Sequence, residues 1–361
     1  MQKSFRRALA LLAALACVLT GGVAAFAQTP AEARGAALTY IAANVTAPTV
    51  ASVGGEWTIL ALARGNAAVP AGYYSGYADR VKQILRANGG VLPGSTINKT
   101  EYSRVVIALS ALGEDVTNFD GRNLLLPLAN FDDVKAQGIL GVAYALIAFD
   151  TRDWAIPAIA DTTAQATRQR LIDNILGREL ASGGFARAGT AAEPDVTAMA
   201  LQTLAPYRSQ PAAATAIANA LTALSDMQQP NGGFSYDAEG ETSESAAQVV
   251  TALAALGTDP ANELFAKALA ALLKFQKSNG SFNHVAAGTG SVQMATEQAA
   301  CALVAYERLV SGKKPLYDMS DVTPKTDGPP VSPPKWWESP PLPPWLHWIL
   351  RWIFFGWIWM G

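Results

Sequence analysis

Acidic residues recur in this sequence at places where a carboxylic acid could do chemistry. Glu101, Asp195 and Glu244 each lie 13 residues after the Asn or Ser that opens a repeated glycine-rich segment, at the start of an apolar helical stretch. A carboxylic acid that its surroundings keep neutral can donate a proton to a substrate. A carboxylate in the first turn of a helix also stabilises that helix by about 0.3–1 kcal/mol through the helix dipole. The pattern is therefore compatible with acid catalysis and with helix stabilisation.

A second group of polar residues falls inside the apolar stretches themselves. Alignment of the repeats places Arg104, Gln248 and Gln298 at equivalent positions, with Glu297 beside Gln298 about one turn into its helix. Burying such groups is costly unless they are paired or face a wet cavity. We expect them either to brace adjacent helices or to line a central pocket. The candidate ligand-binding residues are Arg104, Gln248, Glu297, Gln298, Trp57, Tyr236 and His284.

Histidine and cysteine are too scarce for the common metal and nucleophile chemistries. The chain has two histidines and two cysteines, and Cys17 falls in an expected targeting segment. A zinc enzyme usually needs three His, Cys or carboxylate ligands; no such spacing occurs, nor does a Ser/His/Asp triad or a phosphate-binding glycine loop. His284 lies in a polar loop, where it is either solvated or an axial ligand to a corrinoid cobalt. The net charge of −2 gives no electrostatic basis for binding nucleic acid.

The two ends of the chain differ from its middle. Residues 1–27 combine a basic start, an apolar run and an A-x-A cleavage site, which predicts a signal peptide and export. Residues 312–344 are rich in proline, which favours an extended linker. Residues 345–361 would form a helix of roughly 25 Å, and their five tryptophans suit a membrane interface. We therefore expect an extracytoplasmic, cell-surface protein whose tail anchors it to the membrane, either by spanning it or by lying in its interface.

The middle of the chain repeats one pattern. Its clearest copies begin at Ser182, Asn231 and Asn279, so their starts are 49 and 48 residues apart. An apolar rhythm of about 3.6 residues between the copies predicts helices, whereas the alternation typical of strands is almost absent. Two helices in each copy give about six helical hairpins over residues 28–311. Repeats of this kind predict an all-α protein, an α/α toroid in which the helices after the glycine loops form an inner ring.

The glycine loops carry a resemblance to a known superfamily. The spacing Q-x-x-x-G-x-F begins at Gln228 and again at Gln276, and it resembles the Gln-Trp repeat of triterpene cyclases with Phe in place of Trp. The α/α-toroid superfamily includes squalene and hopene cyclases, protein prenyltransferase β-subunits and cobalamin carriers of the transcobalamin type. The resemblance covers about 280 residues and implies the toroid fold.

Each of these families implies different functional residues. Prenyltransferase β-subunits bind zinc through an Asp, a Cys and a His, whereas the helical region here holds one Cys and one His. Cyclases that begin by protonation carry Asp-x-Asp-Asp-Thr-Ala, which is similar to the segment "EPDVTA" at residues 193–198. The resemblance places Asp195 at the position of the proton donor and Glu193 at that of the first acid, while Val196 replaces the last Asp. Cobalamin carriers add a small β-domain, which this sequence does not predict.

The resemblance of "ESAAQVVTALAALG", residues 244–257, to the inner helices of the cobalamin carriers favours a binding protein over an enzyme. We expect an exported, membrane-tethered repeat protein that binds a small organic ligand, cobalamin-like or isoprenoid, or a surface partner. The alternatives are a terpenoid-cyclase-like enzyme with Asp195 as the acid and a structural cell-surface adhesion module. A closed apolar cavity would favour the cyclase, an open polar bowl the carrier, and a filled centre the adhesion module. The sequence requires no cofactor, and cobalamin is a candidate ligand.

Overall fold

The computed structural model describes residues 28–94, 99–235, 240–285, 288 and 292–325. Within these ranges the chain forms α-helices and loops, with isolated β-bridges and no strand, so the prediction of an all-α protein is confirmed. None of the described helices is long and apolar enough to cross a membrane. The expected signal peptide, residues 326–344 of the proline-rich linker, the tryptophan-rich tail and Tyr236 lie outside the described residues.

Twelve α-helices occur in the described part of the chain, and they alternate between two sets. The first set, which we call the outer helices, comprises α2 (Pro30–Asn44), α4 (Tyr73–Ala87), α6 (Phe131–Lys135), α8 (Arg168–Leu176), α10 (Pro211–Met227) and α12 (Glu263–Leu273). The second set, the inner helices, comprises α3 (Trp57–Arg64), α5 (Thr100–Ala111), α7 (Gly138–Asp150), α9 (Pro194–Leu204), α11 (Ser243–Leu256) and α13 (Gln293–Val310). A kinked segment, Ser52–Glu56, whose backbone is non-helical at Val53, Gly54 and Gly55, leads into α3.

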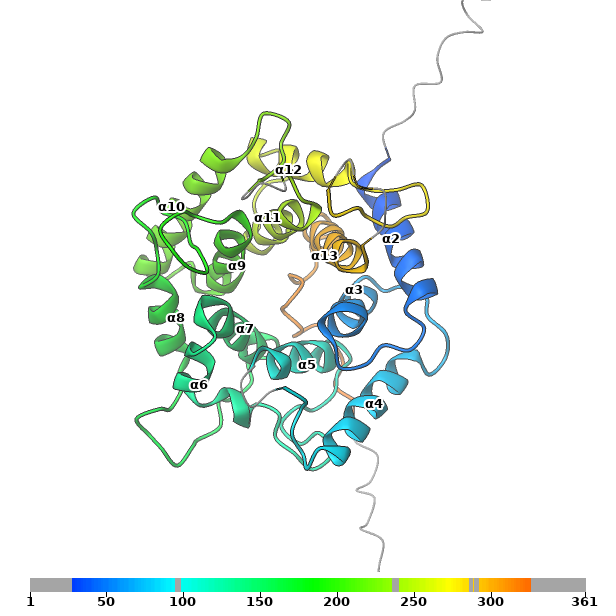
Figure 1. The fold of residues 1–361 in the computed structure, drawn as a ribbon, viewed down its shortest axis with the longest axis vertical. Coiled ribbons are helices and arrows are strands. Elements are labelled where there is room, and N and C mark those ends of the chain that lie inside the picture. The colour runs from blue at the N-terminus through cyan, green and yellow to red at the C-terminus, as the bar shows by residue number, and fades with distance from the viewer. Residues whose placement is uncertain (1–27, 95–98, 236–239, 286–287, 289–291, 326–361) are drawn as a thin grey trace, which may run out of the picture. The chain divides into compact units, whose positions relative to one another are not determined.

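The contacts of the inner helices run in a closed circle. Each inner helix contacts the next along the chain, from α3 through α5, α7, α9 and α11 to α13, and α13 contacts α3 again. The outer helices lie outside this circle (Figure 1), with α2 against α3 and α13, α8 against α7, α10 against α9, and α12 against α11. The first and last inner helices are therefore neighbours in space.

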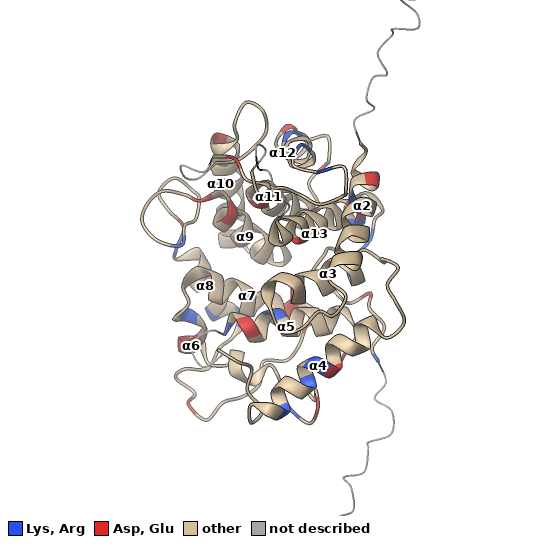
Figure 2. Cartoon of the chain, turned by 45° about the vertical axis from the view of Figure 1, so that its right-hand side comes forward, with Lys and Arg blue, Asp and Glu red and all other residues tan. Residues whose placement is uncertain are grey.

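The sequences of the two sets suit their surroundings. Helix α7 is apolar on all sides, and nine of its thirteen residues are buried, as expected for a helix packed on several faces. Helix α4 instead buries Tyr77, Ala78, Val81 and Leu85 on one side and carries Lys, Arg and Asp on the other. Figure 2 shows this difference, because α4 alternates blue and red while α9, α11 and α13 are mostly tan.

The repeated glycine loops connect an outer helix to the inner helix that follows it, and they pack against the next outer helix. Gly232 has a φ of 93°, and a Cβ there would lie 2.4 Å from the carbonyl oxygen of Lys267 in α12. Only glycine combines this left-handed backbone with such a close approach. The aromatic residue that follows, Phe234, is completely buried, as are Phe185 and Phe282 at the equivalent positions. The loops therefore serve as packed joints between hairpins.

The glutamine of the Q-x-x-x-G-x-F spacing bonds the same joint together. Gln228 Nε2 donates to the Gly232 carbonyl oxygen and to the Leu264 carbonyl oxygen in α12, both at 3.1 Å. Gln276 Nε2 makes the same pair of bonds in the last copy, to its own loop at 3.1 Å and to the Ala33 carbonyl oxygen in α2 at 2.8 Å. The last loop thus closes the array onto the first helix.

A segment that follows α13 was not expected to pack on the helices. Residues 311–324, which we call the strap, belong to the same compact unit as the helices, past residue 311 where the repeats were expected to end. The backbone N–H of Met319 donates to the carbonyl oxygen of Thr151 at the end of α7 at 2.7 Å. The buried guanidinium of Arg64 donates to three carbonyl oxygens of the strap at 2.7–3.0 Å. It also pairs with Asp321, at 2.6 Å, and Arg308 pairs with the other oxygen of the same carboxylate.

Candidate ligand-binding site

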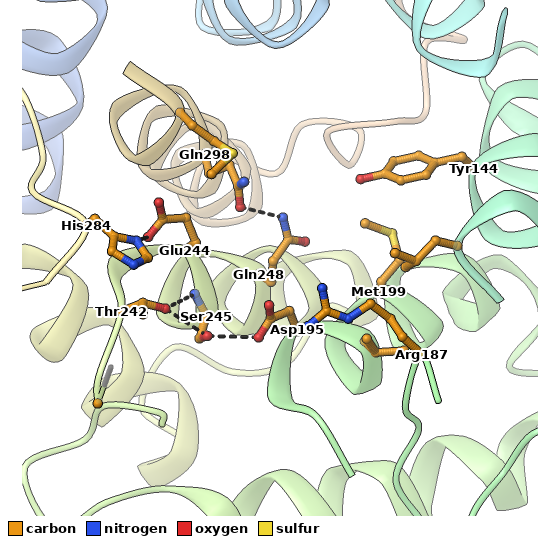
Figure 3. A pocket seen from close by; sticks show the side chains of 14 residues that line it. Tyr144, Arg187, Asp195, Met199, Thr242, Glu244, Ser245, Gln248, His284 and Gln298 are labelled. Carbon is orange, nitrogen blue, oxygen red and sulfur yellow. Dashed lines mark hydrogen bonds and ion pairs between the residues drawn. The ribbon is translucent and has the colours of Figure 1, made fainter. Parts of the chain in front are cut away.

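A pocket of about 370 Å³ opens at the N-terminal ends of α9, α11 and α13, beside α7. The acidic residues at the second positions of α9 and α11, Asp195 and Glu244, lie in its wall (Figure 3). The pocket is lined by Leu140, Tyr144, Arg187, Asp195, Val196, Met199, Gly240, Thr242, Glu244, Ser245, Gln248, His284, Met294 and Gln298. Its wall therefore combines carboxylates, cations, hydroxyls and amides with a few apolar side chains.

Glu244 is the most deeply placed charge of the pocket. Its Oε2 lies 2.8 Å from His284 Nδ1 and accepts a hydrogen bond from Ser243 Oγ at 3.1 Å. Its Oε1 is buried and accepts no hydrogen bond from the residues that the structure describes, and Figure 3 shows this oxygen turned away from His284. A buried carboxylate oxygen without a donor is costly. A ligand that donates a hydrogen bond would offset this cost.

Asp195 is held by a chain of hydroxyl groups. Thr242 is the N-cap of α11, where its Oγ1 accepts from the backbone N–H of Ser245 at 3.2 Å. The same hydroxyl donates to Ser245 Oγ at 2.9 Å, and Ser245 Oγ donates to Asp195 Oδ1 at 2.8 Å. The capping residue of one inner helix thus positions the acid of its neighbour.

Three glutamines link neighbouring inner helices below these acids. Gln202 Nε2 donates to Gln248 Oε1 at 2.8 Å, and Gln248 Nε2 donates to Gln298 Oε1 at 3.0 Å. Gln248 and Gln298 both line the pocket. Both expectations therefore hold for Gln248 and Gln298, because their side chains bond adjacent inner helices together and also line the pocket.

Glu193 and Asp195 have different partners: Glu193 pairs with Arg187, and Asp195 accepts from Ser245. Its side chain is buried, and Arg187 contacts both oxygens, through the backbone N–H at 3.0 Å and Nε at 2.7 Å. Asp195 has no part in this pair and bonds to Ser245 instead. The two acids that resemble the cyclase motif therefore do not act as one group.

Glu297 and Arg104, which were candidates for the pocket, lie elsewhere. Glu297 is buried between α13 and the start of α3, where it accepts from the Gly54 N–H at 3.0 Å and from the hydroxyl of Thr58. Burial raises the pKa of this carboxyl above its usual value. Arg104 pairs with Glu101 on its own helix. Both residues are helix braces, and neither lines the pocket.

The remaining candidates divide between the pocket and its surroundings. His284 is in the pocket wall, and Trp57 lies outside it with its ring 5.7 Å from that of Tyr144. Sequence reasoning missed Tyr144, Met199, Ser245 and Arg187. Tyr144 had a usable signal, because it is the only side chain with a polar group between Gly141 and Phe149 in an otherwise apolar run. Ser245 could also have been found from the sequence, because it directly follows Glu244, one of the acids that recur at the starts of the inner helices.

Glu56 forms a buried charge cluster outside the pocket. It accepts from Tyr77 Oη at 3.0 Å and from the Ala51 N–H at 3.2 Å, and its Oε2 lies 3.8 Å from Arg104 Nε. Burial raises the pKa of this carboxyl to about 8, despite the opposing charge of Arg104. Glu101, the second acid beside Arg104, raises it further.

This cluster predicts a pH-dependent stability. Between pH values of about 4.5 and 8 the folded chain keeps the Glu56 proton that the unfolded chain has lost, so the free energy of unfolding should fall as pH rises. The slope approaches about 1.4 kcal/mol per pH unit for one proton. We expect Glu56→Gln, which stays neutral, to flatten this dependence in urea denaturation between pH 5 and 8. An unchanged slope in Glu56→Gln would contradict the assignment.

Comparison with known proteins assigns neither a family nor a function to this chain. No protein-family model matches the chain, and a search of curated proteins finds no similar sequence. Across the described residues, no group of three or more His, Cys, Asp and Glu side chains could hold a metal ion.

Proposed function

We propose that this chain is an α/α toroid of six helical hairpins that binds a small, polar organic ligand in the pocket at the N-terminal ends of α9, α11 and α13. The observation that carries the proposal is the buried Oε1 of Glu244 in the pocket wall, which accepts no hydrogen bond from the described residues. We further propose that the protein is exported and is tethered to the membrane by residues 345–361. The closed circle of inner helices supports the toroid.

The pocket predicts the chemistry of its ligand. A volume of about 370 Å³ falls at the small end of the usual range for organic ligands, about 300–1,000 Å³. The acceptors Glu244 and Asp195 favour a ligand with hydrogen-bond donors, an ammonium or hydroxyl groups. Hydrocarbon isoprenoids such as squalene carry no such donors and suit this wall poorly. The ligand class is therefore a hydroxylated or amine-bearing small molecule.

One observation keeps a corrinoid as the second candidate ligand. The contact between Glu244 and His284 Nδ1 is of the kind that orients an imidazole for binding a metal through its other nitrogen. A corrinoid is larger than this pocket, so that only part of it would be enclosed. We rank it below a small polar ligand for this reason.

Binding fits the geometry better than cyclase chemistry does. A proton-donating acid must be held neutral by an apolar site or by a neighbouring like charge. Asp195 instead accepts a hydrogen bond from Ser245, and the nearby acid Glu193 is engaged by Arg187. The rim is open, since the side chains of Arg187 and His284 are 59% and 36% exposed. Carbocation chemistry requires the opposite, a dry and apolar cavity.

The test of the proposed function is the loss of binding in Glu244→Gln. Native mass spectrometry of the full chain should show a co-purified polar molecule, and calorimetry with glucosamine, an amine-bearing polyol, measures affinity directly. Loss of a hydrogen bond to a charged group costs about 1.5–3 kcal/mol, so we expect Glu244→Gln to weaken binding roughly 10- to 150-fold.

The matched control is Glu101→Gln, because Glu101 has the equivalent position in an earlier repeat and does not line the pocket. It should leave the affinity within about two-fold. Cyanocobalamin binding that disappears in Glu244→Gln would move the assignment to a corrinoid carrier. Cyclised squalene that disappears in Asp195→Asn would make the protein an enzyme and overturn the proposal.

A further inference from the structure

A second, larger cavity lies at the other ends of the inner helices. It has a volume of about 880 Å³ and is bounded by the C-terminal parts of α7, α9 and α11, by the residues that follow α9, and by the strap. Its walls are mainly apolar, with Ile147, Ala205, Pro206, Tyr207, Ala255 and Leu316 among them. Cavities of this size and character are typical of sites for organic ligands. None of its lining residues lines the first pocket.

One buried polar atom in this cavity has no hydrogen-bond partner among the residues that the structure describes. Gln202 is only 4% exposed, and its Oε1 accepts no hydrogen bond from the described part of the chain. Its Nε2 donates to both the backbone and the side-chain oxygen of Gln248, at 3.1 and 2.8 Å. Rotating the amide by 180° would place an oxygen against these two acceptors, so the bonds fix its orientation. Oε1 is therefore an acceptor that a ligand donor can satisfy.

The acids that line the cavity pair with Arg168 and Lys314, and two arginines of the wall form no ion pair with the described residues. Asp150 is occupied by Arg168 at 2.8 Å and by the hydroxyl of Tyr207 at 2.7 Å. Asp153, a third acid of the wall, pairs with the same arginine at 3.1 Å. In the same wall, Asp318 pairs with Lys314. Two arginines remain, and neither forms an ion pair with any residue that the structure describes. Arg152 lies over the Trp154 ring, 5.7 Å from its centroid, and the exposed Arg208 donates to the Leu256 carbonyl oxygen.

These features define one class of ligand. We propose that the second cavity binds an amphipathic organic anion, with its apolar body among the inner-helix ends and the strap, and its anionic group between Arg152 and Arg208. An N–H or O–H group on the body donates to Gln202 Oε1. This site is separate from the pocket of Glu244 and does not depend on the ligand proposed there.

The probe for this site is 1-anilinonaphthalene-8-sulfonate, which combines an apolar body, one N–H donor and a sulfonate. We expect the full chain, reconstituted in peptidiscs, to bind it at one saturable site by fluorescence titration. The double variant Arg152→Ala/Arg208→Ala should weaken this binding at least ten-fold. N-phenyl-1-naphthylamine has the same body and donor without the charge, and its affinity should change less than two-fold.

Two further variants complete the test. Arg86→Ala/Arg178→Ala removes two arginines that do not line the cavity, and it should leave both affinities unchanged. Gln202→Leu removes the acceptor and should weaken both probes by a similar factor. The proposal is overturned if Arg152→Ala/Arg208→Ala binds the sulfonate as tightly as the unmodified chain. It is also overturned if the charged and neutral probes lose affinity equally in that variant.

Discussion

Replacing Arg64 by alanine should lower the free energy of unfolding by about 3–5 kcal/mol, the usual cost of removing one partner of a buried ion pair. Arg64 is 6% exposed and donates to the carbonyl oxygens of Leu316, Pro315 and Asp318 at 3.0, 2.9 and 2.7 Å. It also shares the carboxylate of Asp321 with Arg308. The alanine variant leaves three carbonyl oxygens and part of a charge without donors.

Denaturation in guanidinium chloride measures this loss, and limited proteolysis shows where it acts. Cleavage within residues 311–324 should become faster in Arg64→Ala, because the strap loses its main anchor. The free energy of unfolding of Arg64→Lys should lie between those of the unmodified chain and Arg64→Ala, because an ammonium cannot reach four acceptors in fixed directions. Arg34→Ala is the control, because Arg34 donates to a single carbonyl oxygen, that of Gly65. Equal stability of Arg64→Ala and Arg34→Ala would refute the role of Arg64.

Gly280→Ala should destabilise the fold by about 2–5 kcal/mol. Gly280 has a φ of 90°, which costs a side-chain-bearing residue about 1–2 kcal/mol. A Cβ there would also lie 2.4 Å from the carbonyl oxygen of Ala36 in α2. Overpacking of this kind costs about 1–3 kcal/mol. The substitution therefore pushes the last loop away from the first helix.

Gly257→Ala separates the two contributions in the same measurement. Gly257 has a φ of 71°, and a Cβ there would meet nothing within 4 Å, so this variant carries the backbone strain without the clash. We expect it to lose about 1–2 kcal/mol. If Gly280→Ala lost no more stability than Gly257→Ala, the close approach to α2 would have no energetic weight.

The all-α class could be predicted because its signals are local. Helical periodicity, glycines at the loops and apolar helix faces are visible within one repeat, and each copy repeats them. The buried aromatic at Phe234 and its equivalents could be predicted for the same reason. The strap could not, since residues 311–324 have no periodicity, and their anchor Arg64 is about 250 positions away in the chain.

The candidate site could be predicted in part, and the errors have a geometric cause. Asp195, Gln248, Gln298 and His284 do share one pocket. Glu297 is adjacent to Gln298, but neighbouring residues point about 100° apart around a helix, so its carboxylate faces α3 instead. Arg104 has the register of the pocket residues, yet α5 contributes no residue to the pocket. Alignment of the repeats predicts how far along its helix a residue lies more reliably than it predicts the side of the helix on which its side chain points.

Closure of the array onto α2 changes how the molecule can lose its structure. In an open stack of repeats, stability is roughly a sum over nearest neighbours, and the outermost repeats can fray because each lacks one neighbour. Here the Gln276 amide and the Gly280 loop give the last hairpin the first one as its neighbour. No hairpin is then terminal, and none can melt without breaking two interfaces at once. Unfolding should therefore proceed as one cooperative transition, with no peeling of single repeats from either end.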